Sequence, residues 1–154
     1  MTSRNHIEDF LRSKRLALVG VSRKETDFSR ALFREFLRRG YDAVPVNPEA
    51  EELDGHRCFH RVQEITPPVD GALLFTVPKV TESVVMDCAA AGIPRVWMYR
   101  AGGKGAVSRA AIGFCKSKGI AVIPGFCPYM FWKDAAFFHR LHGFFVKLAS
   151  GLSL

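Results

Sequence analysis

Five short apolar runs constrain the fold of this chain most strongly, because none of them alternates apolar with polar residues. They cover residues 16–21, 43–46, 71–77, 95–99 and 120–123. Strands that are apolar on both faces belong to parallel sheets with helices on both sides, whereas half-exposed strands alternate. The pattern therefore predicts five buried parallel strands.

Amphipathic segments separate these runs and supply the crossovers that parallel strands need. Helical spacing predicts helices over 28–39, 79–91 and 106–118, each followed by a glycine suited to ending a helix. The turn-rich segment 49–70 is expected to hold one short helix, around 62–65. This order predicts an α/β fold: a single doubly wound, Rossmann-like domain over residues 1–154, with helices on both faces of a five-stranded parallel sheet.

Residues near the C-terminus carry a second pattern. Phe137, Leu141, Phe144, Phe145 and Leu148 recur at helical spacing. They predict an amphipathic C-terminal helix whose aromatic stripe is buried in the core or in a homodimer contact.

Composition narrows the classes of partner. The 22 Lys and Arg residues outnumber the 15 Asp and Glu residues, giving a net charge of +7. That net charge suits an anionic ligand. The sequence lacks the clustered basic stripe of nucleic-acid binders, so no nucleic-acid partner is expected. No apolar run approaches the ~18 residues of a membrane span. Without a signal-peptide pattern or paired cysteines, a cytoplasmic protein with no membrane partner is expected.

The loop after the first predicted strand has the composition of a phosphate site. In doubly wound sheets ligands bind beyond the carboxyl ends of the strands. Gly20 permits close approach to a ligand, Ser22 and Ser29 supply hydroxyls, and Arg23 and Lys24 supply cations beside the next helix N-terminus. The loop is therefore predicted to bind phosphate.

This loop does not match the common nucleotide motifs. It has a single glycine in place of G-x-G-x-x-G, and no carboxylate follows the second strand to hold an NAD ribose. The segment 102–105 is not a Walker A loop. An NAD(P)-linked oxidoreductase on a degenerate site, with Arg23 and Lys24 holding a 2′-phosphate, is the alternative hypothesis.

Four strings in chain order resemble the small stand-alone CoA-binding proteins, whose Rossmann-like domain is similar to the CoA-binding domain of the succinyl-CoA ligase alpha subunit. They are LVGVSRK at 18–24, VPVNP at 44–48, VDGALLF at 69–75 and IPGFCPYM at 123–130. The resemblance extends over nearly the whole chain.

The resemblance implies coenzyme A (CoA) as the cofactor and binding without catalysis, as a carrier, sensor or redox adaptor. It implies diphosphate contacts at Gly20, Ser22, Arg23 and Ser29, adenosine contacts at Asn47 and Pro48, nucleotide contacts at Thr76, Val77 and Pro78, and a pantetheine path along Arg100, Ala101 and Gly102.

Cys127 follows the last predicted strand and has two interpretations. In the first, its thiol would lie near the CoA sulfur and exchange disulfide with it. In the second, it is a small buried residue packed under Pro128. No metal site is expected, since His56, Cys58 and His60 lack the fourth ligand of a structural zinc site.

Overall fold

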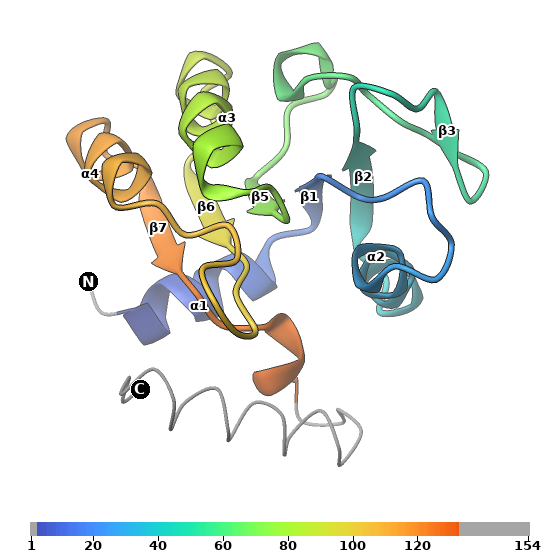
Figure 1. The fold of residues 1–154 in the computed structure, drawn as a ribbon, viewed down its shortest axis with the longest axis horizontal. Helices are drawn as coiled ribbons and strands as arrows, with labels where there is room; N and C mark the ends of the chain where they lie inside the picture. Colours follow the sequence, from blue (N-terminus) through green and yellow to red (C-terminus); the bar gives the residue numbers. More distant parts are fainter. Residues whose placement is uncertain (1–2, 133–154) are drawn as a thin grey trace.

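A computed structural model describes residues 3–132 and contains a parallel five-stranded sheet (Figure 1). Its strands are β1 (Arg15–Val19), β2 (Asp42–Val46), β5 (Gly71–Leu74), β6 (Arg95–Met98) and β7 (Ala121–Pro124). They lie in the order β2-β1-β5-β6-β7, and every neighbouring pair is parallel. The predicted sheet is confirmed. The strand order reverses between β1 and β5, where doubly wound folds bind their ligands.

The three predicted crossover helices are also present, within three residues of their predicted ends. They are α2 (Phe28–Arg38), α3 (Pro78–Ala90) and α4 (Arg109–Ser117). The short helix expected around 62–65 is the 3-10 helix η1 (Val62–Glu64), and a second 3-10 helix, η2 (Pro128–Met130), follows β7. The helix predicted over 137–148 lies outside the described residues.

Besides η2, the helix α1 and one hairpin were not predicted. The helix α1 (Ser3–Arg12) precedes the sheet, and a two-stranded antiparallel hairpin, β3 (Glu52–Leu53) with β4 (His56–Arg57), follows β2. The hairpin turn has positive φ at Asp54 (51°) and Gly55 (80°). An Asp-Gly pair is the usual sequence for such a turn, because both central residues must adopt positive φ.

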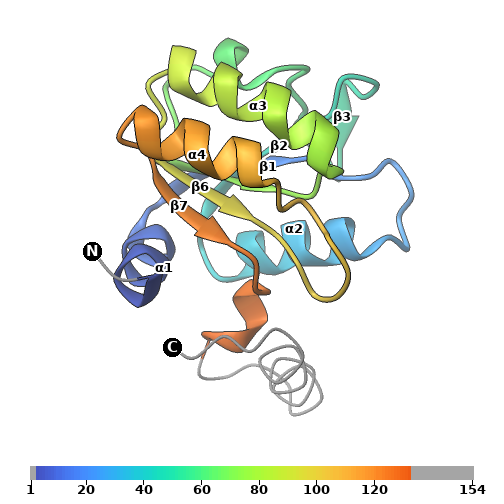
Figure 2. The ribbon, with the colours of Figure 1, turned by 60° about the vertical axis from the view of Figure 1, so that its left-hand side comes forward.

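The helices cover both faces of the sheet (Figure 2). Helices α1 and α2 lie on one side, α3 and α4 on the other. Alternate residues of β1 face the two layers: Leu16 and Leu18 belong to the core under α1 and α2, while Ala17 and Val19 belong to the core under α3 and α4. Burial on both faces explains why the strand sequences do not alternate.

Neither a membrane-spanning helix nor a cluster of metal ligands occurs in the part of the chain that the structure describes. In residues 3–132, no helix has the length and apolar character needed to span a membrane. Over the same range, no three His, Cys, Asp or Glu side chains gather as metal ligands would.

Candidate functional site

A pocket of about 410 Å³ lies at the carboxyl edge of the sheet, where the strand order reverses. We call it the carboxyl-edge pocket. Its volume is typical of small-molecule sites. The loops after β1, β5 and β6 form it, with the lining residues Gly20, Ser22, Asp27, Phe28, Ser29, Phe75, Thr76, Val77, Tyr99, Gly105 and Ala106.

Gly20 brings the loops after β1 and β5 into close contact. Its φ is +94°, and a Cβ placed there would lie 3.4–3.5 Å from atoms of Phe75 and Thr76. Its backbone N–H donates to the Val46 carbonyl at 2.8 Å. A Cβ at these distances makes ordinary van der Waals contact, so the positive φ is what disfavours a side chain here. The backbone conformation therefore favours glycine at this end of the pocket.

Hydrogen bonds within the loop already use the Ser29 hydroxyl. It donates to Asp27 Oδ2 at 2.6 Å and accepts from the Ser22 N–H at 2.9 Å. The Asp27 carboxylate also accepts the Ser29 N–H at 2.9 Å and so caps α2. A carboxylate at this helix N-terminus is favourable for the helix but repels a phosphate from the same position. The predicted anion site at the start of α2 is therefore occupied by a side chain of the chain itself.

The start of α3 differs from the start of α2. Its N-cap residue, Val77, has no side-chain hydrogen bond to the helix, and Pro78 begins the first turn. The first N–H groups of a helix have no intrahelical partner, and together they attract anions. The exposed Lys79 lies there too, with its Nζ 3.8 Å from the Glu82 carboxylate, which offsets part of its positive charge. Because Thr76 and Val77 line the pocket, this uncapped N-terminus lies at its rim.

A hydroxyl pair holds the β5–α3 loop in place. The hydroxyls of Thr76 and Thr81 are 2.7 Å apart and share a hydrogen bond. Thr81 is fully buried, and its hydroxyl also contacts the Val77 carbonyl oxygen at 3.2 Å. The buried Thr81 side chain thus fixes the loop that leads into the α3 N-terminus.

Three aromatic rings form one wall of the pocket. The ring centroids of Phe28 and Tyr99 are 5.5 Å apart, and those of Phe75 and Tyr99 are 5.4 Å apart. Phe28 keeps 37% of its surface exposed. Burial, followed by the nearby Cys127, raises the pKa of the Tyr99 hydroxyl far above its usual value. A neutral aromatic wall of this kind suits a flat or apolar part of a ligand.

A buried arginine supports the β1–α2 loop from behind. Arg30 is 4% exposed and donates from Nη1 to the carbonyls of Ser22 (3.3 Å) and Arg23 (3.1 Å). Its Nη2 lies 2.6 Å from Asp54 Oδ1 in the β3–β4 turn, and Arg34 Nε lies 2.8 Å from Asp54 Oδ2. Hydrogen bonds from these two arginines hold the pKa of Asp54 well below its usual range. The hairpin therefore anchors the pocket loop through this ionic contact.

The predicted cations lie outside the pocket lining. Arg23 is exposed and pairs with the exposed Glu49 at 3.3 Å, and Lys24 is exposed. Exposed pairs of this kind contribute about 0–1 kcal/mol, so Arg23 exchanges its partner at little cost. Both cations belong to the β1–α2 loop, whose Gly20 and Ser22 line the pocket.

The predicted residues Asn47, Pro48 and Pro78 lie in loops next to the pocket or at its edge. The Asn47 amide donates to the Val21 carbonyl at 2.9 Å and accepts from the Glu49 N–H at 2.8 Å, which ties the loops after β1 and β2 together. Pro48 is exposed beside it, and Pro78 lies next to the pocket as the first residue of α3.

The β6–α4 loop meets the pocket through Gly105 and Ala106, not through its first residues. Arg100 donates its N–H to the Phe126 carbonyl at 3.3 Å, which holds it toward the end of β7. Ala101 and Gly102 follow it and do not line the pocket. A Cβ on Gly105 (φ +52°) would clash with the Tyr99 carbonyl.

Cys127 is almost completely buried behind Tyr99. Burial raises the pKa of its thiol to about 11. With this pKa, little thiolate exists near neutral pH, and the thiolate is the reactive form of cysteine. These properties favour the interpretation of Cys127 as a small packed residue over thiol exchange.

The structure thus brings together five of the predicted residues: Gly20, Ser22, Ser29, Thr76 and Val77. The prediction did not include Asp27, Phe28, Phe75, Tyr99, Gly105 and Ala106. Phe75 and Tyr99 come directly after β5 and β6, so the rule that ligands bind beyond strand ends contained the signal. Asp is also a preferred N-cap residue.

Comparison with known proteins identifies the family. Residues 14–133 match the family model described as the CoA binding domain. The uncharacterized protein YneT of Bacillus subtilis is 29% identical over 126 residues, covering 81% of this chain and 90% of that protein. The alpha subunit of acetate–CoA ligase (ADP-forming) II of Pyrococcus furiosus is 25% identical over 97 residues, which cover 62% of this chain and 21% of that subunit.

Solved structures agree with this relationship. A hypothetical protein from Pyrococcus horikoshii superimposes with a TM-score of 0.75 and 29% identity, covering 83% of this chain and 87% of that chain. An acetyl-coenzyme A synthetase of Candidatus Korarchaeum cryptofilum gives a TM-score of 0.66 at 25% identity, covering 75% of this chain and 27% of that chain. The resemblance in the sequence strings is confirmed: this chain belongs to the CoA binding domain family.

Proposed function

We propose that this chain binds coenzyme A in the carboxyl-edge pocket and acts as a carrier or sensor without a reaction of its own. One observation carries the proposal: in a CoA binding domain, an aromatic wall and an uncapped helix N-terminus meet at the strand-order reversal. The aromatic wall suits the flat or apolar parts of CoA. The helix N-terminus suits its phosphates.

The charges around the pocket favour one orientation of the ligand. The diphosphate would lie at the start of α3, near Lys79, because Asp27 repels it from the start of α2. The adenine or pantetheine would contact Phe28 and Tyr99. The 3′-phosphate of CoA carries roughly −1.5 to −2 charges, by analogy with other phosphomonoesters, and would lie toward the exposed cations of the β1–α2 loop.

The pocket lining supports binding rather than catalysis. Asp27 is engaged as a helix cap, and the raised pKa of Tyr99 keeps its hydroxyl protonated. The ligase relatives are much longer, and this chain spans 21% or less of them. A cytoplasmic location and a homodimer through residues 137–148 remain predictions alongside this function.

A thermal-shift comparison of CoA, dephospho-CoA, NADP and NAD at equal concentration tests the ligand class. A ligand present at one hundred times its dissociation constant adds ~2.7 kcal/mol of stability. For a domain of this size that raises Tm by about 5–10 °C. CoA should give the largest shift, with dephospho-CoA weaker because it lacks the 3′-phosphate. Stabilisation by NADP with none by CoA would favour the oxidoreductase hypothesis instead.

Calorimetric titration of two variants tests the pocket. Phe28→Ala removes one ring of the aromatic wall, and stacking on a base is worth ~1–3 kcal/mol, so CoA affinity should fall about 5- to 150-fold. Met86→Ala is the matched control, since Met86 is an exposed apolar side chain on α3 that does not line the pocket. Equal CoA affinity in Phe28→Ala and Met86→Ala would exclude the pocket as the binding site.

A further inference from the structure

We propose that the β6–α4 loop, residues 99–108, closes over the bound ligand and that Lys104 then contacts its diphosphate. This inference rests on the proposed binding of CoA in the carboxyl-edge pocket. Figure 2 shows the loop, in yellow to orange, projecting beyond the carboxyl end of β6. We call residues 101–105, with the sequence Ala-Gly-Gly-Lys-Gly, the loop tip.

Both ends of the loop are attached to the rest of the domain. The Tyr99 N–H donates to the Leu74 carbonyl at 3.0 Å, and the Ala106 N–H donates to the Tyr99 carbonyl at 2.8 Å. Ser108, the N-cap residue of α4, donates from Oγ to Glu82 Oε1 on α3 at 2.9 Å. The loop is therefore closed at its base and held beside the first turns of α3, where the diphosphate is proposed to lie.

The loop tip is not attached in the same way. Within residues 3–132, none of the N–H groups of the loop tip donates a hydrogen bond to another group of the protein. A Cβ placed on Gly102 or Gly103 would meet no atom within 4 Å, and residues 102–105 are exposed. Because glycine changes φ and ψ at little steric cost, the tip can move while the base of the loop stays in place.

Lys104 is the charged residue of the loop tip. Its side chain is exposed and makes no ion pair or hydrogen bond with any other residue that the structure describes. It is bonded to Gly105, which lines the pocket, so its Cα lies about 3.8 Å from the Cα of a lining residue. A change in the loop-tip backbone can therefore bring this ammonium group over the pocket.

The charges at the pocket favour such a movement once an anion is bound. The charged side chain of the lining is Asp27, which is negative, and the charge of Lys79 is partly offset by Glu82 at 3.8 Å. Lys104 has no competing carboxylate, so it offers a diphosphate a full positive charge. The contact exists only in the closed conformation, and a contact made in only one of two conformations is what shifts the equilibrium toward it.

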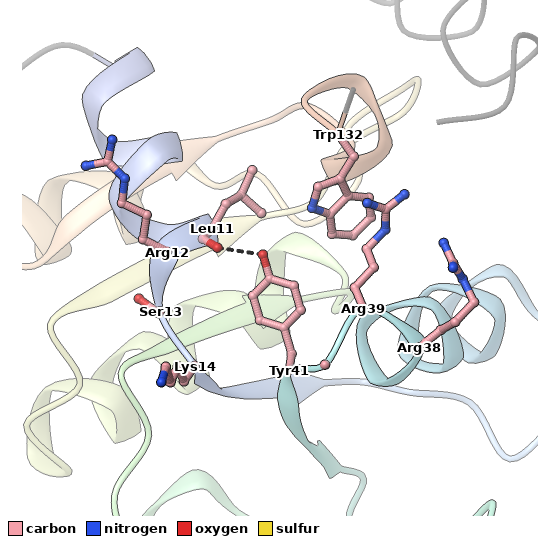
Figure 3. A pocket seen from close by; sticks show the side chains of 9 residues that line it. Leu11, Arg12, Ser13, Lys14, Arg38, Arg39, Tyr41 and Trp132 are labelled. Carbon is pink, nitrogen blue, oxygen red and sulfur yellow. Dashed lines mark hydrogen bonds between the residues drawn. The ribbon is translucent and has the colours of Figure 1, made fainter. Parts of the chain in front are cut away.

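The opposite edge of the sheet does not offer a comparable anion site. A pocket of about 480 Å³ lies there between the ends of α1 and α2 (Figure 3), with Arg12, Lys14, Arg38 and Arg39 in its lining. In Figure 3, Arg12 and Lys14 point away from Arg38 and Arg39, which both pair with Glu35. These cations do not converge on one point, so this pocket does not compete for the diphosphate.

Millisecond amide hydrogen exchange, with and without saturating CoA, tests closure of the loop. The N–H groups of the loop tip should exchange at least tenfold more slowly with CoA, because closure covers them and gives them phosphate oxygens as acceptors. The turn at residues 117–119, at the other end of α4, is the internal control and should not change. Unchanged exchange in the loop tip while CoA is bound would overturn the closure.

Calorimetric titration tests the role of Lys104. Lys104→Gln should weaken CoA binding about tenfold, because a charge-assisted phosphate contact is lost, and Lys104→Arg should retain most of the affinity. The control Lys116→Gln makes the same change in net charge at the end of α4 and should bind CoA as the wild type does. Dephospho-CoA should show the same tenfold loss in Lys104→Gln, because it keeps the diphosphate.

The outcomes separate this proposal from the CoA site itself. Wild-type CoA affinity in Lys104→Gln, or an equal loss in Lys116→Gln, would overturn the role of Lys104 and leave the carboxyl-edge pocket as the CoA site. A loss confined to CoA and absent for dephospho-CoA would overturn the diphosphate contact and place Lys104 at the 3′-phosphate. Unchanged CoA affinity in Phe28→Ala would contradict the pocket, and with it the closure of the loop.

Discussion

The substitution Asp54→Asn tests how the β3–β4 hairpin supports the pocket loop. Asparagine is almost isosteric with aspartate and tolerates the positive φ of 51° at this position, so the turn itself should be preserved. The change removes the negative charge that pairs with the buried Arg30 at 2.6 Å. Arg30 also holds the carbonyls of Ser22 and Arg23, so its orientation affects the pocket.

The geometry limits the magnitude of this effect. Breaking a fully buried ion pair by removing one partner costs about 3–5 kcal/mol. Asp54 keeps 23% of its side chain exposed, and the new amide oxygen still accepts a hydrogen bond, so a loss of about 2 kcal/mol is expected. For a chain of this length, Tm should fall by about 4–8 °C.

Denaturant and thermal unfolding measure this loss, with Arg34→Gln as the control. Arg34 pairs with the same carboxylate, but 45% of its side chain is exposed, so its removal should cost much less. CoA affinity should fall in Asp54→Asn and stay near the wild-type value in Arg34→Gln. Wild-type stability in Asp54→Asn, or an equal loss in Arg34→Gln, would refute the anchoring role of the buried pair.

The Asp54 carboxylate, whose pKa is lowered by hydrogen bonds from Arg34 and Arg30, also predicts a pH dependence. The folded-state pKa of Asp54 lies below its unfolded value, so its stabilisation is complete above the unfolded pKa of ~3.9 and is lost as pH falls toward the folded pKa. The stability difference between wild type and Asp54→Asn should therefore be constant from pH 5 to 7 and shrink below about pH 4. A difference that stays constant to pH 2 would contradict this assignment.

Three further predictions concern the pocket and the residues behind it. Gly105→Ala should destabilise the chain by more than ~1 kcal/mol in urea unfolding, since the new Cβ meets the Tyr99 carbonyl at a positive φ; unchanged stability would argue against this loop geometry. Asp27→Asn keeps a capping side chain but removes the charge, so CoA affinity in calorimetry should rise about two- to tenfold, and a fall would mean that the carboxylate contacts the ligand. Cys127 should stay unmodified by oxidised CoA in native protein and react after unfolding; a native adduct detected by mass spectrometry and lost in Cys127→Ser would restore the redox interpretation.

Hydrophobic patterning predicted the sheet because all five strands are buried on both faces and therefore differ from every other segment. The helix α1 was not predicted, because its inner face has only three apolar residues, Ile7, Phe10 and Leu11, although they recur at helical spacing. The β3–β4 hairpin has two residues in each strand, which is too short for periodicity to register. Its Asp-Gly turn was visible in the sequence.

The position of the carboxyl-edge pocket could be predicted from the sequence, but the hydrogen bonds within it could not. Reading residues beyond strand ends identified Gly20, Thr76 and Val77, because topology fixes where those loops meet. Assigning Ser29 to phosphate failed to anticipate its bond to Asp27, since that bond depends on how the loop folds back on α2. The rings of Phe28 and Tyr99 were not predicted as lining because core and pocket aromatics have the same sequence pattern.

A crystal structure of this chain with CoA tests the central claim most directly. We expect the ligand in the carboxyl-edge pocket, with its diphosphate at the uncapped start of α3 and a flat or apolar part against Phe28 and Tyr99. CoA bound elsewhere, or a diphosphate placed over the Asp27-capped start of α2, would contradict the account.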